Sequence, residues 1–267
     1  MNRIAALVGK DLADLRRHPG LFWPAGLTAA IALVLPFVVA IVIPRLTGDR
    51  LSDSSDFRIA VEMFVNQSGA RALDPEGAIQ AWILQQFLPL LVLAPVAGSM
   101  AIAAASVVGE KQARTLEPLL ATPITTFELL AAKVLAALLP SIAMTIVCFS
   151  CYVGLAAAVA QPGVFWVLLG SRSLAVAFVL GPLAALAALQ LAVCVSSRTN
   201  DARSAQQIGA LVILPLGGVL VAQLTGSFTL TVPVTLSIAA GLLLFDALLM
   251  WIGIVLFDRE SILTRWK

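Results

Sequence analysis

Residues 107–133 read VVGEKQARTLEPLLATPITTFELLAAK, and they interrupt a chain that is otherwise strongly apolar. Of the 267 residues, 60% are hydrophobic and only 12% are charged, whereas soluble domains carry about 25% charged residues. The mean hydropathy is +0.98. This composition predicts an integral membrane protein in which the quoted stretch is a polar loop between two membrane spans.

Six apolar segments approach or exceed the roughly 20 residues that a helix needs to cross a bilayer. They are residues 21–43, 78–108, 134–160, 173–195, 208–224 and 236–257. The fifth is the shortest and contains a proline and two glycines. Because a helix satisfies its own backbone hydrogen bonds in lipid, we expect an all-α polytopic protein whose six transmembrane helices form one domain over residues 1–267.

The distribution of Lys and Arg predicts the orientation. Twelve of the 17 lie in residues 1–20, 109–133, 196–207 and 258–267, and the intervening loops hold the other five. We therefore expect both termini and the quoted loop to be cytoplasmic, in the inner (cytoplasmic) membrane. Residues 44–77 then form an external loop.

Two shorter amphipathic helices are predicted outside the spans. In residues 1–20, Ile4, Leu7, Leu12 and Leu15 share one helical face, which is typical of a helix lying on a membrane surface. Pro19 and the following glycine would turn the chain into the first span. In the external loop, residues 56–67 show the same pattern.

The quoted loop contains signals that break and restart helices. Pro118 suits the first turn of a short helix that carries Leu116, Leu119 and Leu120 on one side. Thr125 and Glu128 match a capping box that begins a new helix running into the third span. Exposed leucines at the tip of such a helical hairpin indicate a docking surface; folding back onto the N-terminal helix is the alternative.

Four polar side chains lie inside predicted spans and are candidates for a substrate path. Asp246 is either a substrate or proton site, or a neutral acid bonded to a neighbouring helix, because a buried charge is costly in lipid. Gln85, Gln86 and Gln190 more commonly make interhelical hydrogen bonds.

Several function classes find no support. One histidine and three cysteines provide no metal or disulfide framework, and Cys148 and Cys151 lie among apolar residues where packing is favoured over redox chemistry. The net charge of +2 does not suggest a nucleic-acid partner. The sequence lacks a GxxxxGK[ST] phosphate-binding loop and a catalytic constellation, so we expect no enzyme activity and no cofactor on this chain.

Residues 110–133 resemble the signature of the ABC type-2 transporter permease family. The matching residues are Thr115, Leu116, Glu117, Leu119, Leu120, Thr122, Pro123, Glu128 and Lys133. Arg114 stands where the family usually has glycine. The number of spans, the N-terminal helix and the length also agree with this family.

The resemblance implies that the loop is a coupling helix docking onto a separate ATP-binding-cassette ATPase, which would bind ATP and Mg²⁺. Two permease copies, as a homodimer, would assemble with two ATPases in the bilayer. The implied docking residues are Glu110, Arg114, Thr115, Leu116, Glu117, Leu119, Leu120, Thr122 and Pro123, with Arg3, Lys10 and Arg17 as a second contact.

The function that we expect is the membrane subunit of an ABC exporter. Two alternatives stay open at this point. One is an ion-coupled carrier or channel that uses Asp246, and the other is a membrane assembly subunit that transports nothing.

Overall fold

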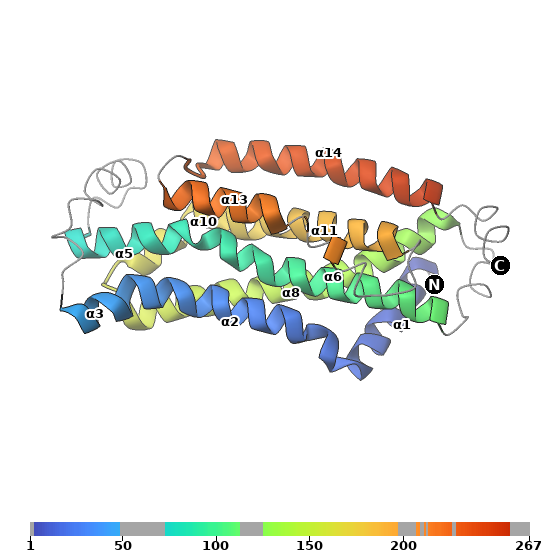
Figure 1. Ribbon diagram of the computed structural model, residues 1–267, viewed down its shortest axis with the longest axis horizontal. Coiled ribbons are helices and arrows are strands. Elements are labelled where there is room, and N and C mark those ends of the chain that lie inside the picture. The colour runs from blue at the N-terminus through green and yellow to red at the C-terminus, as the bar shows by residue number, and fades with distance from the viewer. Residues whose placement is uncertain are drawn as a thin grey trace.

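The structure, a computed structural model, describes residues 3–48, 73–112, 125–196, 207–208, 211, 213–225 and 228–256. Within these residues the regular structure is entirely helical (Figure 1). Five segments are long and apolar enough to cross a membrane: Pro19–Thr47, Pro75–Glu110, Thr126–Val159, Ser171–Ser196 and Val232–Leu256. The predicted all-α, multi-pass class is confirmed.

The predicted fifth span is represented by a shorter helix. Helix α13 covers Ile213–Leu224, which is 12 residues. At 1.5 Å per residue it is about 18 Å long, whereas the hydrocarbon core is about 30 Å thick. Residues 209, 210 and 212 lie outside the described part of the chain, so the sixth crossing stays a prediction.

Helix α1 spans Arg3–Arg17 as the sequence predicts. It ends at His18, and the 3-10 turn η1, Pro19–Phe22, leads into the first span. A proline is tolerated at this position because the backbone N–H groups in the first turn of a helix have no intrahelical partner. Leu15 is buried among apolar residues of helices α6 and α8. The helix is therefore anchored on the bundle, and its position at a membrane surface stays a prediction.

Prolines shape the first and fourth spans. The first contains α2 (Trp23–Phe37), η2 (Val38–Val42) and α3 (Ile43–Thr47), and the fourth contains α10 (Ser171–Ala175), η5 (Val176–Leu180) and α11 (Gly181–Ser196). Both η2 and η5 are π-helical turns. Each is followed two residues later by a proline, Pro44 or Pro182, which lacks an N–H and crowds the carbonyl four residues back. The wider turn accommodates that proline.

The second span is broken about a third of the way from its N-terminal end. Helix α5, Pro75–Gln86, stops at Phe87, and α6 runs from Leu88 to Gln112. Pro89 lies in the first turn of α6, where its missing N–H is tolerated. The break places two glutamines at the end of α5, with both side chains buried.

Helix α8, Thr126–Val159, is the longest, with 34 residues. Its predicted capping box is confirmed: the Glu128 amide donates to Thr125 Oγ1 at 3.1 Å, and the Thr125 amide donates to Glu128 Oε2 at 2.8 Å. The short helix α9, Val164–Leu168, follows after a turn. The described chain ends with α14, Val232–Leu256.

Helix α6 lies at the centre of the bundle and packs against α2, α8 and α11 (Figure 1). In the most apolar window of its span 83% of the residues are buried, compared with 22% in the window of α14. Helix α14 contacts α11 on one side and exposes large apolar residues on the other, including Leu244 and Trp251. In a membrane protein, this exposed face is suited to lipid.

Small residues allow α6 and α11 to approach closely. Ala184, Ala185 and Ala188 are at most 1% exposed, and Ser99 Oγ on α6 donates to the Ala185 carbonyl at 3.0 Å. The predicted role of these alanines in helix packing agrees with this contact.

Two predicted elements lie outside the described residues. They are the coupling helix within residues 113–124 and the external amphipathic helix at 56–67.

Replacing Ala185 with leucine should destabilise the protein by about 1–3 kcal/mol, because extra methyl groups would force α6 and α11 apart. Thermal unfolding of the detergent-solubilised chain measures this. Ala157→Leu on the exposed face of α8 is the matched control and should change stability little. Equal melting temperatures for the two variants would contradict the close packing.

Candidate functional site

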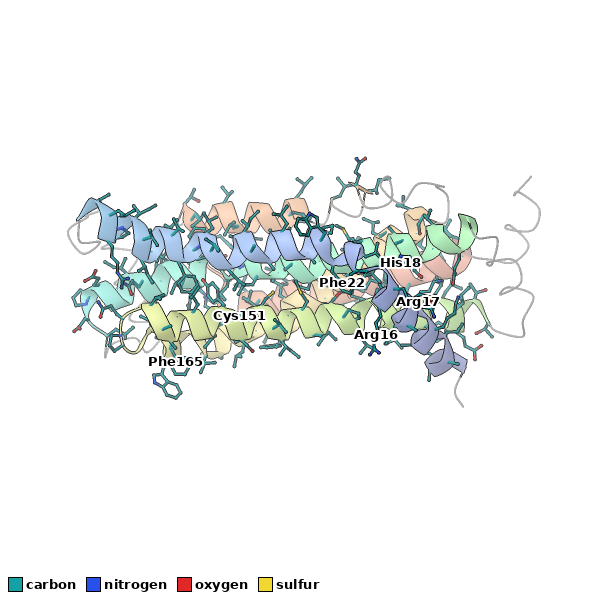
Figure 2. All side chains as sticks on the ribbon, turned by 90° about the horizontal axis from the view of Figure 1, so that it is seen from below. Arg16, Arg17, His18, Phe22, Cys151 and Phe165 are labelled. Atoms are coloured by element: carbon teal, nitrogen blue, oxygen red, sulfur yellow. The ribbon has the colours of Figure 1, made fainter. Side chains whose placement is uncertain are left out.

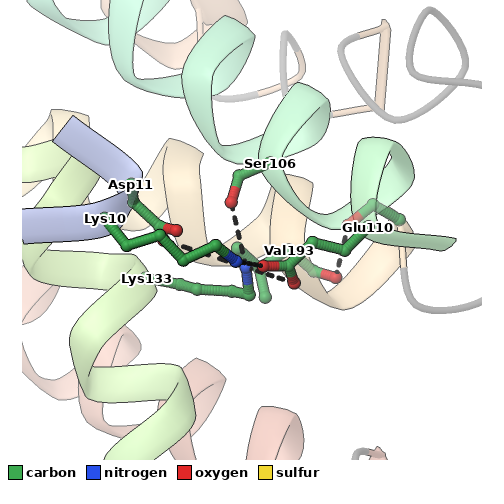
Figure 3. A network of polar contacts seen from close by, with 7 residues as sticks. Lys10, Asp11, Ser106, Glu110, Lys133 and Val193 are labelled. Carbon is green, nitrogen blue, oxygen red and sulfur yellow. Dashed lines mark hydrogen bonds and ion pairs between the residues drawn. The ribbon is translucent and has the colours of Figure 1, made fainter. Parts of the chain in front are cut away.

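A charged cluster joins three helices at the end of the bundle that carries α1 (Figure 3). Glu110, near the end of α6, lies with Oε2 2.7 Å from Lys133 Nζ of α8 and Oε1 3.0 Å from Lys10 Nζ of α1. We call Lys10, Asp11, Ser106, Glu110 and Lys133 the base cluster. It ties α1, α6 and α8 together through one carboxylate.

Lys133 is the buried member of the base cluster. Its side chain is 3% exposed, and its Nζ donates to Ser106 Oγ at 3.0 Å and lies 3.9 Å from Asp11 Oδ2. A buried ammonium costs several kcal/mol unless it is paired and hydrogen-bonded. Three oxygen partners from two other helices provide that compensation, so the lysine fixes the relative positions of the helices.

The pKa shifts of the two α1 residues reflect this setting. Burial lowers the pKa of Lys10, but the hydrogen bond and charge of Glu110, with Asp11 and Asp14, outweigh it and raise the pKa above its ordinary value. Burial raises the pKa of Asp11, and Glu110 adds to that shift against the opposing charge of Lys133. The charge of Glu110 thus raises the pKa of both α1 residues.

The base cluster lies where helices α6 and α8 adjoin the polar loop. Glu110 precedes residues 113–124 by one turn of α6, and Lys133 follows the capped start of α8 by two turns. The ion pair between Glu110 and Lys133 therefore joins the end of α6 to the start of α8, the two helices that enter and leave the loop. Through Lys10 and Asp11, α1 is attached to the same point.

A pocket of about 840 Å³ opens beside the base cluster, between α1, the turn after it, α6 and α8. Arg17 and His18 line it, and Figure 2 shows them with Arg16 at the bend between α1 and α2. Apolar residues such as Leu21 and Ile102 complete its wall. The pocket combines both signs of charge with an apolar surface.

The predicted docking residues are described only in part. Glu110 lies in the base cluster. The other eight lie outside the described residues: Arg114, Thr115, Leu116, Glu117, Leu119, Leu120, Thr122 and Pro123. Of the predicted second contact, Lys10 is in the base cluster and Arg17 lines the pocket, while the side chain of Arg3 is outside the described part.

The four polar residues predicted inside the spans fall into two places. Gln85 and Gln86 end α5, whereas Gln190 and Asp246 belong to α11 and α14. Within the described residues no hydrogen bond connects the first pair to the second. Gln85 and Gln86 both bond across helices, as sequence reasoning favoured: Gln85 Nε2 donates to the Val167 carbonyl at 3.1 Å, and Gln86 Nε2 donates to the Gln223 carbonyl at 3.3 Å.

Asp246 is 4% exposed, and neither of its carboxylate oxygens has a hydrogen-bond partner among the described residues. It points from α14 into the packed side of the bundle, not toward the exposed apolar face. An unpaired carboxylate in this setting is destabilising.

The cysteines and acids provide no metal site within the described residues. Cys148 and Cys151 of α8 are both free: Cys148 is buried, whereas Cys151 is exposed (Figure 2).

Sequence reasoning missed two residues that the structure brings to Gln86. They are Arg172 of α10 and Gln223 of α13, each 3.1 Å from Gln86 Oε1. Each lies far along the chain from Gln86, so spacing alone could not connect them.

Comparison with known proteins places the chain in a family. The family model described as "ABC-2 family transporter protein" matches residues 69–241, which is more than half of the chain. The chain belongs to the ABC-2 transporter permease family. The match includes the polar loop, α5 to α13 and the first part of α14. No curated protein and no solved structure gives a significant match.

Members of this family are non-catalytic membrane subunits of ABC transporters, which pair with an ATP-binding-cassette ATPase in the bilayer. The chain is accordingly a multi-pass membrane protein. This agrees with the resemblance found in residues 110–133.

Lys133→Met should lower the free energy of unfolding by about 3–5 kcal/mol, because Glu110 would keep a largely buried charge without its closest partner. Lys10→Met removes a cation that is 45% exposed and should cost less than about 1 kcal/mol. Chemical unfolding in detergent micelles compares the two. A cost for Lys133→Met no greater than that for Lys10→Met would contradict the central role of Lys133.

Asp246→Asn should raise the melting temperature, because it removes a buried unpaired charge at nearly constant volume. Asp14→Asn is the control: Asp14 is exposed on α1, so the neutral variant should melt near the wild-type temperature. A lower melting temperature for Asp246→Asn would mean that the carboxylate stabilises the fold.

Proposed function

We propose that this chain is the permease subunit of an ABC exporter that is driven by ATP hydrolysed on a separate ATPase subunit. Family membership is the observation that carries the proposal, and it favours this function over an ion-coupled carrier. ATP and Mg²⁺ bind to the partner. Two copies of the permease assemble with two ATPases in the cytoplasmic membrane.

In this proposal the end of the bundle that carries α1 faces the cytoplasm. The excess of Lys and Arg in residues 1–20, 109–133, 196–207 and 258–267 supports this orientation. The loop at 113–124 then projects toward the ATPase. Leu116, Leu119 and Leu120 fill a groove on the ATPase, and Arg114 and Glu117 contact its rim.

The base cluster supports a route for mechanical coupling. Movement of the docked loop displaces the end of α6 and the start of α8 together, because Glu110 and Lys133 are joined at 2.7 Å. Lys10 and Asp11 carry the same displacement to α1. Since α6 is the central helix, its movement alters its contacts with α2 and α11.

Leu119→Asp and Leu120→Asp should abolish co-purification with the ATPase, because a charge in an apolar docking groove is desolvated without a partner. The measurement is pull-down of the co-expressed ATPase, followed by substrate-stimulated ATP hydrolysis in the complex. Ala113→Asp introduces the same charge at a loop position outside the predicted docking set and serves as the control. Wild-type recovery of the ATPase with both leucine variants would refute the docking assignment.

A further inference from the structure

Arg172 has an unusual environment for a cation in a membrane protein. It is half-buried near the start of the fourth span. Its Nη2 donates to Gln86 Oε1 at 3.1 Å, and in the described part of the chain this neutral amide is its only polar partner. Guanidinium has five N–H donors and keeps its charge at any physiological pH. Most of its hydrogen-bonding capacity is therefore unused.

The partner of Arg172 is itself fixed by a second helix. Gln86 Oε1 also accepts from Gln223 Nε2 at 3.1 Å, and Gln86 Nε2 donates to the Gln223 carbonyl at 3.3 Å. Gln86 is 1% exposed and Gln223 is 0% exposed. Helices α5, α10 and α13 thus meet at one amide oxygen, which orients the guanidinium but supplies no negative charge.

The same place contains unused acceptors. Gln85 Nε2 donates to Ser173 Oγ at 3.4 Å, next to Arg172 in the chain. Oε1 of Gln85 and Oε1 of Gln223 are both buried and have no hydrogen-bond partner in the described part of the protein. A buried acceptor without a donor costs about 1–3 kcal/mol. We call Gln85, Gln86, Arg172, Ser173 and Gln223 the Arg172 cluster.

The depth of the Arg172 cluster makes an unpaired cation costly. Gln86 lies 11 residues after Pro75, the start of its 36-residue span, so it is about 16 Å along the helix axis. The whole span is about 54 Å long, whereas the hydrocarbon core is about 30 Å thick. A centred span therefore places Gln86 and Arg172 near the boundary between the headgroups and the hydrocarbon. There an anion stabilises a cation strongly.

We propose that the Arg172 cluster is a binding site for a phosphate-class anionic group that also carries a hydroxyl or amine donor. The planar guanidinium suits paired hydrogen bonds to phosphate oxygens, and the vacant glutamine oxygens suit the donor. Such a group occurs on phospholipid headgroups and on soluble phosphorylated solutes. This site goes beyond the proposed function, because the ATPase and its docking loop take no part in it.

Binding of defined probes to the purified full-length chain in detergent tests the site. The probes are phosphatidylglycerol, phosphatidylcholine and inorganic phosphate, the last against sodium chloride of equal ionic strength. Native mass spectrometry counts bound lipid, and the shift in melting temperature reports phosphate. We expect saturable binding of phosphatidylglycerol above phosphatidylcholine if the source is lipid, and a specific shift with phosphate if it is soluble. Either result must depend on Arg172.

Arg172→Gln should weaken binding of the effective probe by about tenfold or more, since charge-assisted hydrogen bonds are lost. Arg45→Gln is the matched control: Arg45 is exposed at the C-terminal end of the first span and donates to the Val159 carbonyl at 3.3 Å, and its loss should leave binding unchanged. Equal weakening by both changes, or probe binding unaffected by Arg172→Gln, overturns the proposal.

A second variant keeps Arg172 but pairs its guanidinium with a carboxylate of the same chain. Gln86→Glu places a carboxylate against the guanidinium at nearly the same volume. It should abolish probe binding in a chain that elutes as the wild type does in size-exclusion chromatography. Wild-type binding by Gln86→Glu overturns the proposal. Because no ATPase is present, failure here leaves the docking experiment unaffected, and failure of docking leaves this result intact.

Discussion

Every backbone amide and carbonyl within the bilayer must find a partner in the protein, because lipid offers none and an unsatisfied group costs several kcal/mol. This constraint accounts for more than the choice of helices. At Pro44 and Pro182 the chain meets it with π-helical turns. At the break in the second span, the Tyr152 hydroxyl donates to the Leu84 carbonyl at 2.8 Å, and the Leu90 amide donates to the Phe87 carbonyl at 2.9 Å.

The same demand governs the charged groups, and the protein meets it in different ways. Lys133 is fully compensated by Glu110, Ser106 and Asp11, so it joins helices. Among the described residues, Arg172 is held by a neutral oxygen only, which is the basis of the anion site that we propose there. Asp246 has no donor in the described residues. A compensated charge is a structural connection, whereas a fixed but uncompensated one suits a ligand or a proton.

Local signals in the sequence predicted local structure well. The amphipathic pattern gave α1 from Arg3 to Arg17, and the spacing of Thr125 and Glu128 gave the start of α8. These features depend on residues within a turn or two. The loop signature also predicted the family, since seven of the nine residues from Thr115 to Pro123 match it.

Features that depend on contacts between distant segments could not be read in the same way. The resemblance implied Glu110 only as a docking residue, and nothing in the sequence indicated its ion pairs with Lys10 and Lys133, which lie 100 and 23 residues away. Likewise, Gln86, Arg172 and Gln223 meet only because α9 and α10 return the chain beside α5. The sixth crossing, which hydropathy predicts over residues 208–224, is described only as α13, Ile213–Leu224, and stays a prediction.

Helix α8 determines how a displacement at one end of the bundle can reach the other end. Its 34 residues extend about 51 Å, from a capped start near the base cluster to Val159, whose carbonyl accepts a hydrogen bond from Arg45 at the end of the first span. One continuous element thus joins the two ends of the bundle. If the helix tilted as a rigid body about Lys133, Val159 would move further than the residues near Lys133, and no chain of side-chain rearrangements would be needed between the two ends.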